Sequence, residues 1–249
     1  MDNIGISDHL DRKRIERLLK IGLLASMITG TGDFLLGYGT DTVSVDLATR
    51  LMASAPSLSD VQLIIGGSLG MFGIFLEGLS CFAIYRLMAD ASPKYAHIYR
   101  SGILGYIWLA PIGCHLNIAV FNLAYKYLLP VSDRAAHVAD ILFYAFGIPV
   151  YVLLLIFWLP MMVVQFKAFA EGMTPYPSCA KWFNVIVGSI PALLLSLVIG
   201  LSTAFGAAVG TMFLSFGNAF MFGGLLVTLP DESCFSEYKK KRGIDDERS

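Results

Sequence analysis

The sequence predicts an all-α transmembrane bundle of six helices. Hydrophobic residues make up 56% of the 249 residues and charged residues only 15%, whereas soluble domains contain about 25% charged residues. The hydrophobic residues form six long apolar stretches, and most Lys and Arg residues lie in the connections on one side. This composition excludes a large soluble catalytic domain. The net charge of −1 also argues against an extended nucleic-acid surface.

Each apolar stretch approaches or exceeds the roughly 20 residues that a helix needs to cross a bilayer. The stretches are continuously apolar and do not alternate, which disfavours transmembrane strands. Only Ser202 and Thr203 separate the last two stretches, so we expect these helices to be antiparallel neighbours joined by a tight turn. The six expected helices cover residues 21–39, 61–87, 101–125, 140–166, 183–201 and 204–229.

The positions of Lys and Arg predict the orientation. Fifteen of the 18 lie on the side that holds the N-terminus, the second and fourth connections and the C-terminal tail. The other side holds only Arg50, Lys126 and Arg134. Because cytoplasmic connections are enriched in Lys and Arg, we expect a multi-pass protein of the cell membrane with both termini cytoplasmic.

Three segments flank or connect the predicted helices. Residues 1–20 form a basic lead-in that we expect to continue directly into the first helix. Residues 40–60 form the longest connection, and their scattered apolar side chains suggest a short surface helix or lid. Residues 230–249 form a polar tail that we expect to be partly disordered.

Two predicted helices carry a carboxylate within the apolar stretch, and a third carries an imidazole. Asp33, Glu77 and His115 are these residues. An ionisable group at membrane depth is costly and normally faces protein or a wet cavity. Small residues accompany both acids at helical spacing, which allows close helix packing. These faces contain Ser26, Gly30, Asp33 and Gly37 in the first helix, and Gly66, Gly70, Gly73, Glu77 and Ser80 in the second.

Helical spacing assigns further polar residues to the same layer. In the third helix it predicts one face that contains Trp108, Pro111, His115 and Asn122. In the last helix it predicts another face that contains Thr211, Ser215 and Asn218. We expect the two acids to turn into the bundle together, with His115 near them.

No Lys or Arg lies within the core of an apolar stretch, where it could neutralise the acids. Because burial and a neighbouring acid both disfavour a charged carboxylate, the simplest arrangement is a proton shared among Asp33, Glu77 and His115. These three are the candidate catalytic, proton-handling residues. The candidate ligand-binding residues are Phe34, Trp108, Asn122, Ser215 and Asn218. With one histidine in the spans, we expect neither a metal nor another cofactor.

Three kinds of function fit this pattern. The first is a pocket that binds, and by proton transfer transforms, an amphipathic or lipid-like molecule. The second is a small proton-coupled transporter or channel in which the acids carry the proton. The third is a structural membrane subunit whose polar groups link helices by hydrogen bonds. A cavity open towards lipid would favour the first, and a continuous water path would favour the second.

The order of several short motifs resembles a known group of proteins. These are Gly32-Asp33 in the first helix with Tyr38 at its end, His115 in the third, Asn184 at the start of the fifth and Asn218 in the sixth. In this pattern the chain resembles an uncharacterised family of six-helix bacterial integral membrane proteins, grouped as a domain of unknown function. The resemblance covers most of the chain and implies fold and topology only.

Overall fold

The lead-in and the first apolar stretch form one continuous helix, α1 (Arg12–Gly37). Asp11 caps this helix, because its side chain accepts a hydrogen bond from the backbone N–H of Arg14. The expected continuity is therefore confirmed. The computed structural model describes residues 9–40 and 52–244. Residues 41–51 of the expected surface helix or lid lie outside these described residues.

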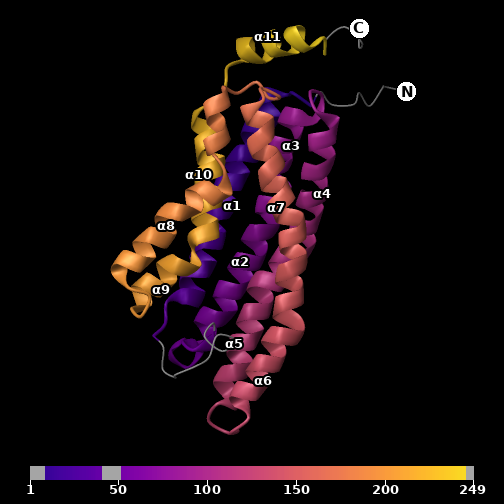
Figure 1. Ribbon diagram of the computed structural model, residues 1–249. Helices are drawn as coiled ribbons and strands as arrows, with labels where there is room; N and C mark the ends of the chain where they lie inside the picture. The colour runs from indigo at the N-terminus through magenta and orange to yellow at the C-terminus, as the bar shows by residue number, and fades with distance from the viewer. Residues whose placement is uncertain (1–8, 41–51, 245–249) are drawn as a thin grey trace, which may run out of the picture.

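The next three apolar stretches form long helical rods, each interrupted once (Figure 1). We count α1 as the first rod. The second rod begins at a capping box made by Ser59 and Gln62. The third and fourth rods each contain a π-helical segment, where one extra residue enters the helical turn. The rods consist of α2 (Asp60–Ser80) and α3 (Phe82–Ala89); α4 (Pro93–Ala110), η3 (Pro111–Leu116) and α5 (Asn117–Leu128); and α6 (Ala135–Leu142), η4 (Phe143–Gly147) and α7 (Ile148–Ala170).

The last two apolar stretches form α8 (Val185–Ile199), α9 (Ala204–Thr211) and α10 (Phe213–Val227). Gly200 ends α8 with a φ of +98°, which favours glycine. Thr203 then caps α9 by accepting a hydrogen bond from the N–H of Gly206. The predicted tight turn is therefore confirmed. The sixth stretch, which we expected as a single helix, is bent by 51° between α9 and α10.

The structure has the apolar helices of a membrane protein. Among the described residues, four helices are long and apolar enough to cross a membrane, and the bent pair α9–α10 raises the number to five. In the rod of α6, η4 and α7, only 6% of the most apolar window is buried within the protein. Such a helix requires apolar surroundings. α8 has 15 residues and is about 22 Å long, shorter than the roughly 30 Å hydrocarbon core.

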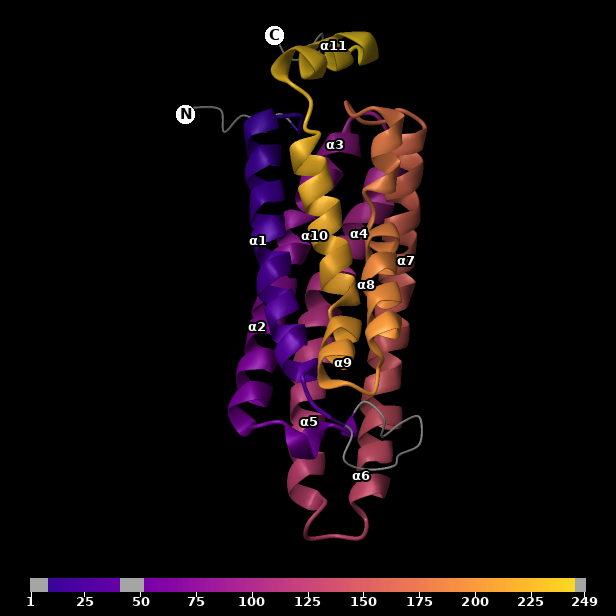
Figure 2. The ribbon, with the colours of Figure 1, turned by 90° about the vertical axis from the view of Figure 1, so that its left-hand side faces the viewer.

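The helices lie side by side in an elongated bundle (Figures 1 and 2). α1 begins and α10 finishes at the same end, across which α11 (Glu232–Arg242) lies; we call this the α11 end. The tail, expected to be partly disordered, thus contains a helix. Its Phe235 is buried in a large apolar core at the α11 end, together with Tyr99, Phe169 and Phe222. A smaller apolar cluster lies near the α5–α6 connection.

α1 and α2 pack closely because glycines face each other at their contact. A Cβ atom added to Gly32 would lie 2.6 Å from the backbone nitrogen of Gly70 and 2.7 Å from the carbonyl oxygen of Gly66. Any side chain at Gly32 would therefore push the two backbones apart. This contact brings the polar faces of α1 and α2 together between the two apolar cores.

Candidate functional site

Asp33 of α1 lies at the centre of a cluster that joins three helical rods. Its Oδ1 is 2.7 Å from Nε2 of His115, and its Oδ2 accepts a 2.5 Å hydrogen bond from the Ser215 hydroxyl of α10. The side chains of His115 and Asp33 are 7% and 13% exposed. We call Asp33, His115 and Ser215 the aspartate cluster. Both carboxylate oxygens of Asp33 are therefore paired within the protein.

The His115 ring occupies space that glycine leaves on α2. A Cβ atom added to Gly70 would lie 1.7 Å from Cδ2 of the ring. His115 itself lies in the π-helical segment η3, and its Nδ1 has no hydrogen-bond partner among the described residues. Two features therefore position the imidazole: the absent side chain of Gly70 on α2 and the extra residue of the π-helical segment η3.

Glu77 of α2 forms a second cluster. Its Oε2 accepts hydrogen bonds from the hydroxyl of Tyr106 at 2.9 Å and from Nδ2 of Asn218 at 2.8 Å. Glu77 is 1% exposed, and its Oε1 makes no hydrogen bond to the part of the chain that the structure describes. We call Glu77, Tyr106 and Asn218 the glutamate cluster. An unpaired oxygen at this depth is costly unless a proton or a water molecule satisfies it.

The two acids turn into the bundle but have separate partners. His115 lies against Gly70, and Glu77 follows Gly70 by seven residues on α2, which is about 10 Å along the helix. The hydrogen bonds between described side chains place His115 with Asp33 and not with Glu77. The structure therefore divides the single shared-proton site that we expected into two clusters, and α10 contributes one residue to each.

The part of the chain that the structure describes contains no group of three or more His, Cys, Asp or Glu side chains suited to hold a metal ion. The two clusters instead offer carboxyl, imidazole, hydroxyl and amide groups. These groups can exchange a proton or bind a polar group of a ligand.

A family model for a family of unknown function, DUF6796, matches residues 1–232. The chain belongs to this family. No curated protein and no solved structure matches the sequence. The match covers every residue of both clusters and stops at the start of α11.

Three of the five predicted ligand-binding residues in this DUF6796 protein belong to neither the aspartate cluster nor the glutamate cluster. Trp108 is 74% exposed on the surface of the bundle, so it does not share the buried face of His115, as we had expected it to. Asn122 is 2% exposed and lines a cavity of about 10 Å³ beside Phe121 and Tyr151. Phe34 stacks on Tyr38, with ring centroids 5.2 Å apart.

The π-helical segment explains the error at Trp108. One line of buried residues along the third rod has spacings of four, five, four and three residues, with the step of five across η3. α-Helical spacing from His115 therefore points to Trp108, whereas the structure places Tyr106 on the buried face. Tyr106 is the residue that sequence reasoning missed. This line consists of Tyr106, Ala110, His115, Ala119 and Asn122.

Proposed function

We propose that this DUF6796 protein crosses the cell membrane six times with both termini in the cytoplasm. Two observations support this topology. Fifteen of 18 Lys and Arg residues lie on the side of the termini, and α1 begins at the same end of the bundle at which α10 finishes. Cysteine introduced at Ser249, in a variant whose native exposed cysteines are replaced, tests the orientation. If this cysteine reacts with a membrane-impermeant reagent added outside intact cells, the C-terminus lies outside and the proposed orientation is wrong.

We further propose that the aspartate cluster exchanges a proton with an amphipathic or lipid-like ligand. The observation that carries this proposal is the 2.7 Å contact between Asp33 and His115 within an apolar bundle. One proton can lie on the aspartate or on the imidazole of such a pair. His115 Nδ1 is buried without a partner among residues 9–40 and 52–244, so it is the atom through which the pair exchanges a proton.

The surroundings of Asp33 support an amphipathic ligand. Ser215 holds one carboxylate oxygen and leaves the other to His115. The next residue, Phe34, packs against Tyr38 and Phe205 and provides an aromatic surface on α1 and α9. A molecule with one polar group and an apolar body fits these contacts. Glu77 and Asn218 would bind or orient a second polar group, one or two helical turns away.

Infrared spectroscopy of the purified protein tests the proton exchange without a known ligand. We expect pH-difference spectra of the parent to contain a carboxyl band that Asp33→Asn removes and His115→Gln alters. Asp133→Asn makes the same change at an exposed position and serves as the control. If the Asp33→Asn and Asp133→Asn spectra both match that of the parent, Asp33 does not titrate and the proposal is refuted.

Mass spectrometry of organic extracts tests the ligand. We expect a small amphipathic molecule to copurify with the parent and with Asp133→Asn, and to be lost or reduced in Asp33→Asn. Equal extracts from a folded Asp33→Asn variant would contradict a ligand-binding role for this residue. Thermal unfolding of each variant separates loss of the ligand from loss of the fold.

Interrupted helices beside the aspartate cluster support proton-coupled transport as a second candidate. His115 lies in a π-helical segment, and the 51° bend between α9 and α10 lies three residues before Ser215. Broken helices at membrane depth are common at transporter sites. Proteoliposomes that contain a pH-sensitive dye distinguish the two candidates. Proton entry that depends on Asp33 supports transport, and its absence together with copurified ligand supports the binding site.

A further inference from the structure

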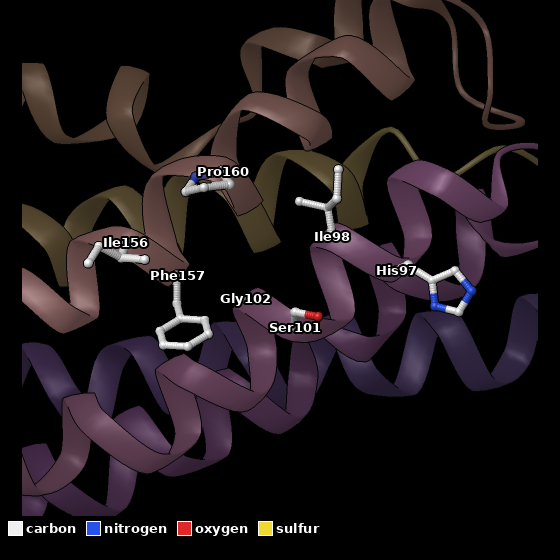
Figure 3. A pocket seen from close by; sticks show the side chains of 7 residues that line it. All are labelled: His97, Ile98, Ser101, Gly102, Ile156, Phe157 and Pro160. Carbon is white, nitrogen blue, oxygen red and sulfur yellow. The ribbon is translucent and has the colours of Figure 1, made fainter.

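A second candidate site lies outside both clusters, on the surface between α4 and α7. It is a groove of about 310 Å³ (Figure 3), which is at the lower end of the range for small-molecule sites. Ile98, Ile156, Phe157 and Pro160 give it apolar walls. His97 lies at one end of the group and Ile156 and Phe157 lie towards the other, with Ser101 and Gly102 between them (Figure 3).

Two glycines of α4 and a proline of α7 account for the groove. A Cβ atom added to Gly102 would lie 2.6 Å from Cβ of Met161, and one added to Gly105 would lie 2.3 Å from the Phe157 ring. α4 and α7 therefore approach closely, with no side chain from α4 at these two positions. Pro160 has no N–H, so the carbonyl of Ile156 lacks its helical donor beside the groove. The groove is therefore a built feature of the helix contact.

Positive and polar side chains gather towards the α11 end of the groove. Lys94, His97 and Ser101 are spaced by three and four residues, so they follow one face of α4, and all three are exposed. Lys167 follows Pro160 by seven residues on α7 and is also exposed. The groove thus combines an apolar end within the bundle with a basic end near its edge.

We infer that this groove binds one acyl chain of an anionic phospholipid. The basic face of Lys94 and His97 would contact the phosphate, and Ser101 would donate a hydrogen bond to the headgroup or the ester. The chain would then lie along Ile98 and Phe157. Phe157 lies 13 residues before the end of α7, about 20 Å along the helix, so the apolar end of the groove lies roughly one leaflet deep from the α11 end.

A phospholipid fits this groove better than a protein segment because both helices expose apolar side chains around it. Leu104, Trp108, Leu153 and Leu159 are exposed on α4 and α7. The inference rests on the membrane location of the bundle, but not on a function of Asp33. A failure of the proton-exchange proposal therefore leaves it untouched.

Native mass spectrometry tests the inference. The full-length protein is delipidated in detergent and titrated with dioleoyl phosphatidylglycerol or dioleoyl phosphatidylcholine. We expect the parent to retain one phosphatidylglycerol more tightly than phosphatidylcholine. Ser101→Phe should fill the groove and abolish tight retention of both lipids. Lys94→Gln should weaken the binding of phosphatidylglycerol about fivefold, because one basic group near a membrane surface contributes about that factor to the affinity.

Two control variants separate the groove from general effects. Lys13→Gln removes an exposed charge from α1, and Leu104→Phe enlarges an exposed side chain of α4 that does not line the groove. Both should bind phosphatidylglycerol like the parent. If Ser101→Phe still binds like Leu104→Phe, or if Lys94→Gln and Lys13→Gln weaken binding equally, the groove is not the lipid site. Asp33→Asn should retain the lipid, which keeps the two proposals distinguishable.

Discussion

The substitution Gly70→Ala tests whether a missing side chain on α2 positions the His115 ring. The added Cβ would lie 1.7 Å from Cδ2 of His115, whereas ordinary contacts begin at 3.4 Å. The ring must therefore move by about 1.7 Å, the difference between these distances. Such a shift is enough to break its 2.7 Å contact with Asp33.

Two effects set the size of the destabilisation. Overpacking costs about 1–3 kcal/mol, and leaving a buried hydrogen-bonding group without its partner costs about 1–3 kcal/mol. We expect Gly70→Ala to lower the free energy of unfolding by roughly 2–6 kcal/mol. Gly223→Ala is the matched control, because a Cβ there would lie 3.6 Å from its nearest neighbour. The control should change the free energy by less than about 1 kcal/mol.

A double-mutant cycle separates the ring contact from helix packing. Unfolding in mixed micelles with increasing SDS gives the free energies of the parent, Gly70→Ala, His115→Ala and the double variant. Once His115→Ala has removed the ring, Gly70→Ala should cost at least about 1 kcal/mol less than in the parent. Additive free energies would show that the ring does not occupy the space above Gly70, and the account of the aspartate cluster would be wrong.

Two further predictions concern the glutamate cluster and α11. Tyr106→Phe removes one hydrogen bond to Glu77 and should lower the free energy of unfolding by about 0.6–2 kcal/mol. Asn218→Leu should cost at least as much, and SDS unfolding measures both; no loss in either variant would contradict the buried bonds. At the start of α11, hydrogen bonds from the Cys234 backbone N–H and from Ser233 lower the pKa of Asp231 from 3.8 to about 2. Because the pKa is lowered on folding, the cap stabilises α11 above pH 3.8 and is lost as the pH falls towards 2. The NMR shift of the Cys234 amide should follow this titration in the parent and not in Asp231→Asn, and a midpoint at 3.8 would refute the cap's effect.

Local spacing predicted the buried faces of the first two helices well. Gly66, Gly70, Gly73, Glu77 and Ser80 are all buried on α2, because their helix is regular from its capping box to the break at Cys81. On α1, Ser26, Gly30 and Gly37 are likewise buried. Small residues at regular spacing describe a contact that involves only two regular helices, so a single sequence was sufficient.

Interruptions of the helices limited the remaining predictions. The extra residue in η3 moved the buried face from Trp108 to Tyr106. The bend before Phe213 divided the sixth apolar stretch into α9 and α10. Whether a π turn or a bend forms depends on tertiary packing as well as local composition. The partners of Asp33 and Glu77 were therefore on the expected helices, but their division into two clusters depended on distances between helices that spacing does not encode.

One turn of α10 links the two acids mechanically. Ser215 binds Asp33 and Asn218 binds Glu77, three residues apart on one rigid helix. A rotation or sliding of α10 that releases one carboxyl group therefore strains the bond to the other. If a change of charge at Asp33 alters the proton affinity of Glu77 through a movement of α10, then thermodynamic linkage requires a change of charge at Glu77 to alter the proton affinity of Asp33 by the same free energy. The glutamate cluster can in this way report the state of the aspartate cluster without direct contact between the acids.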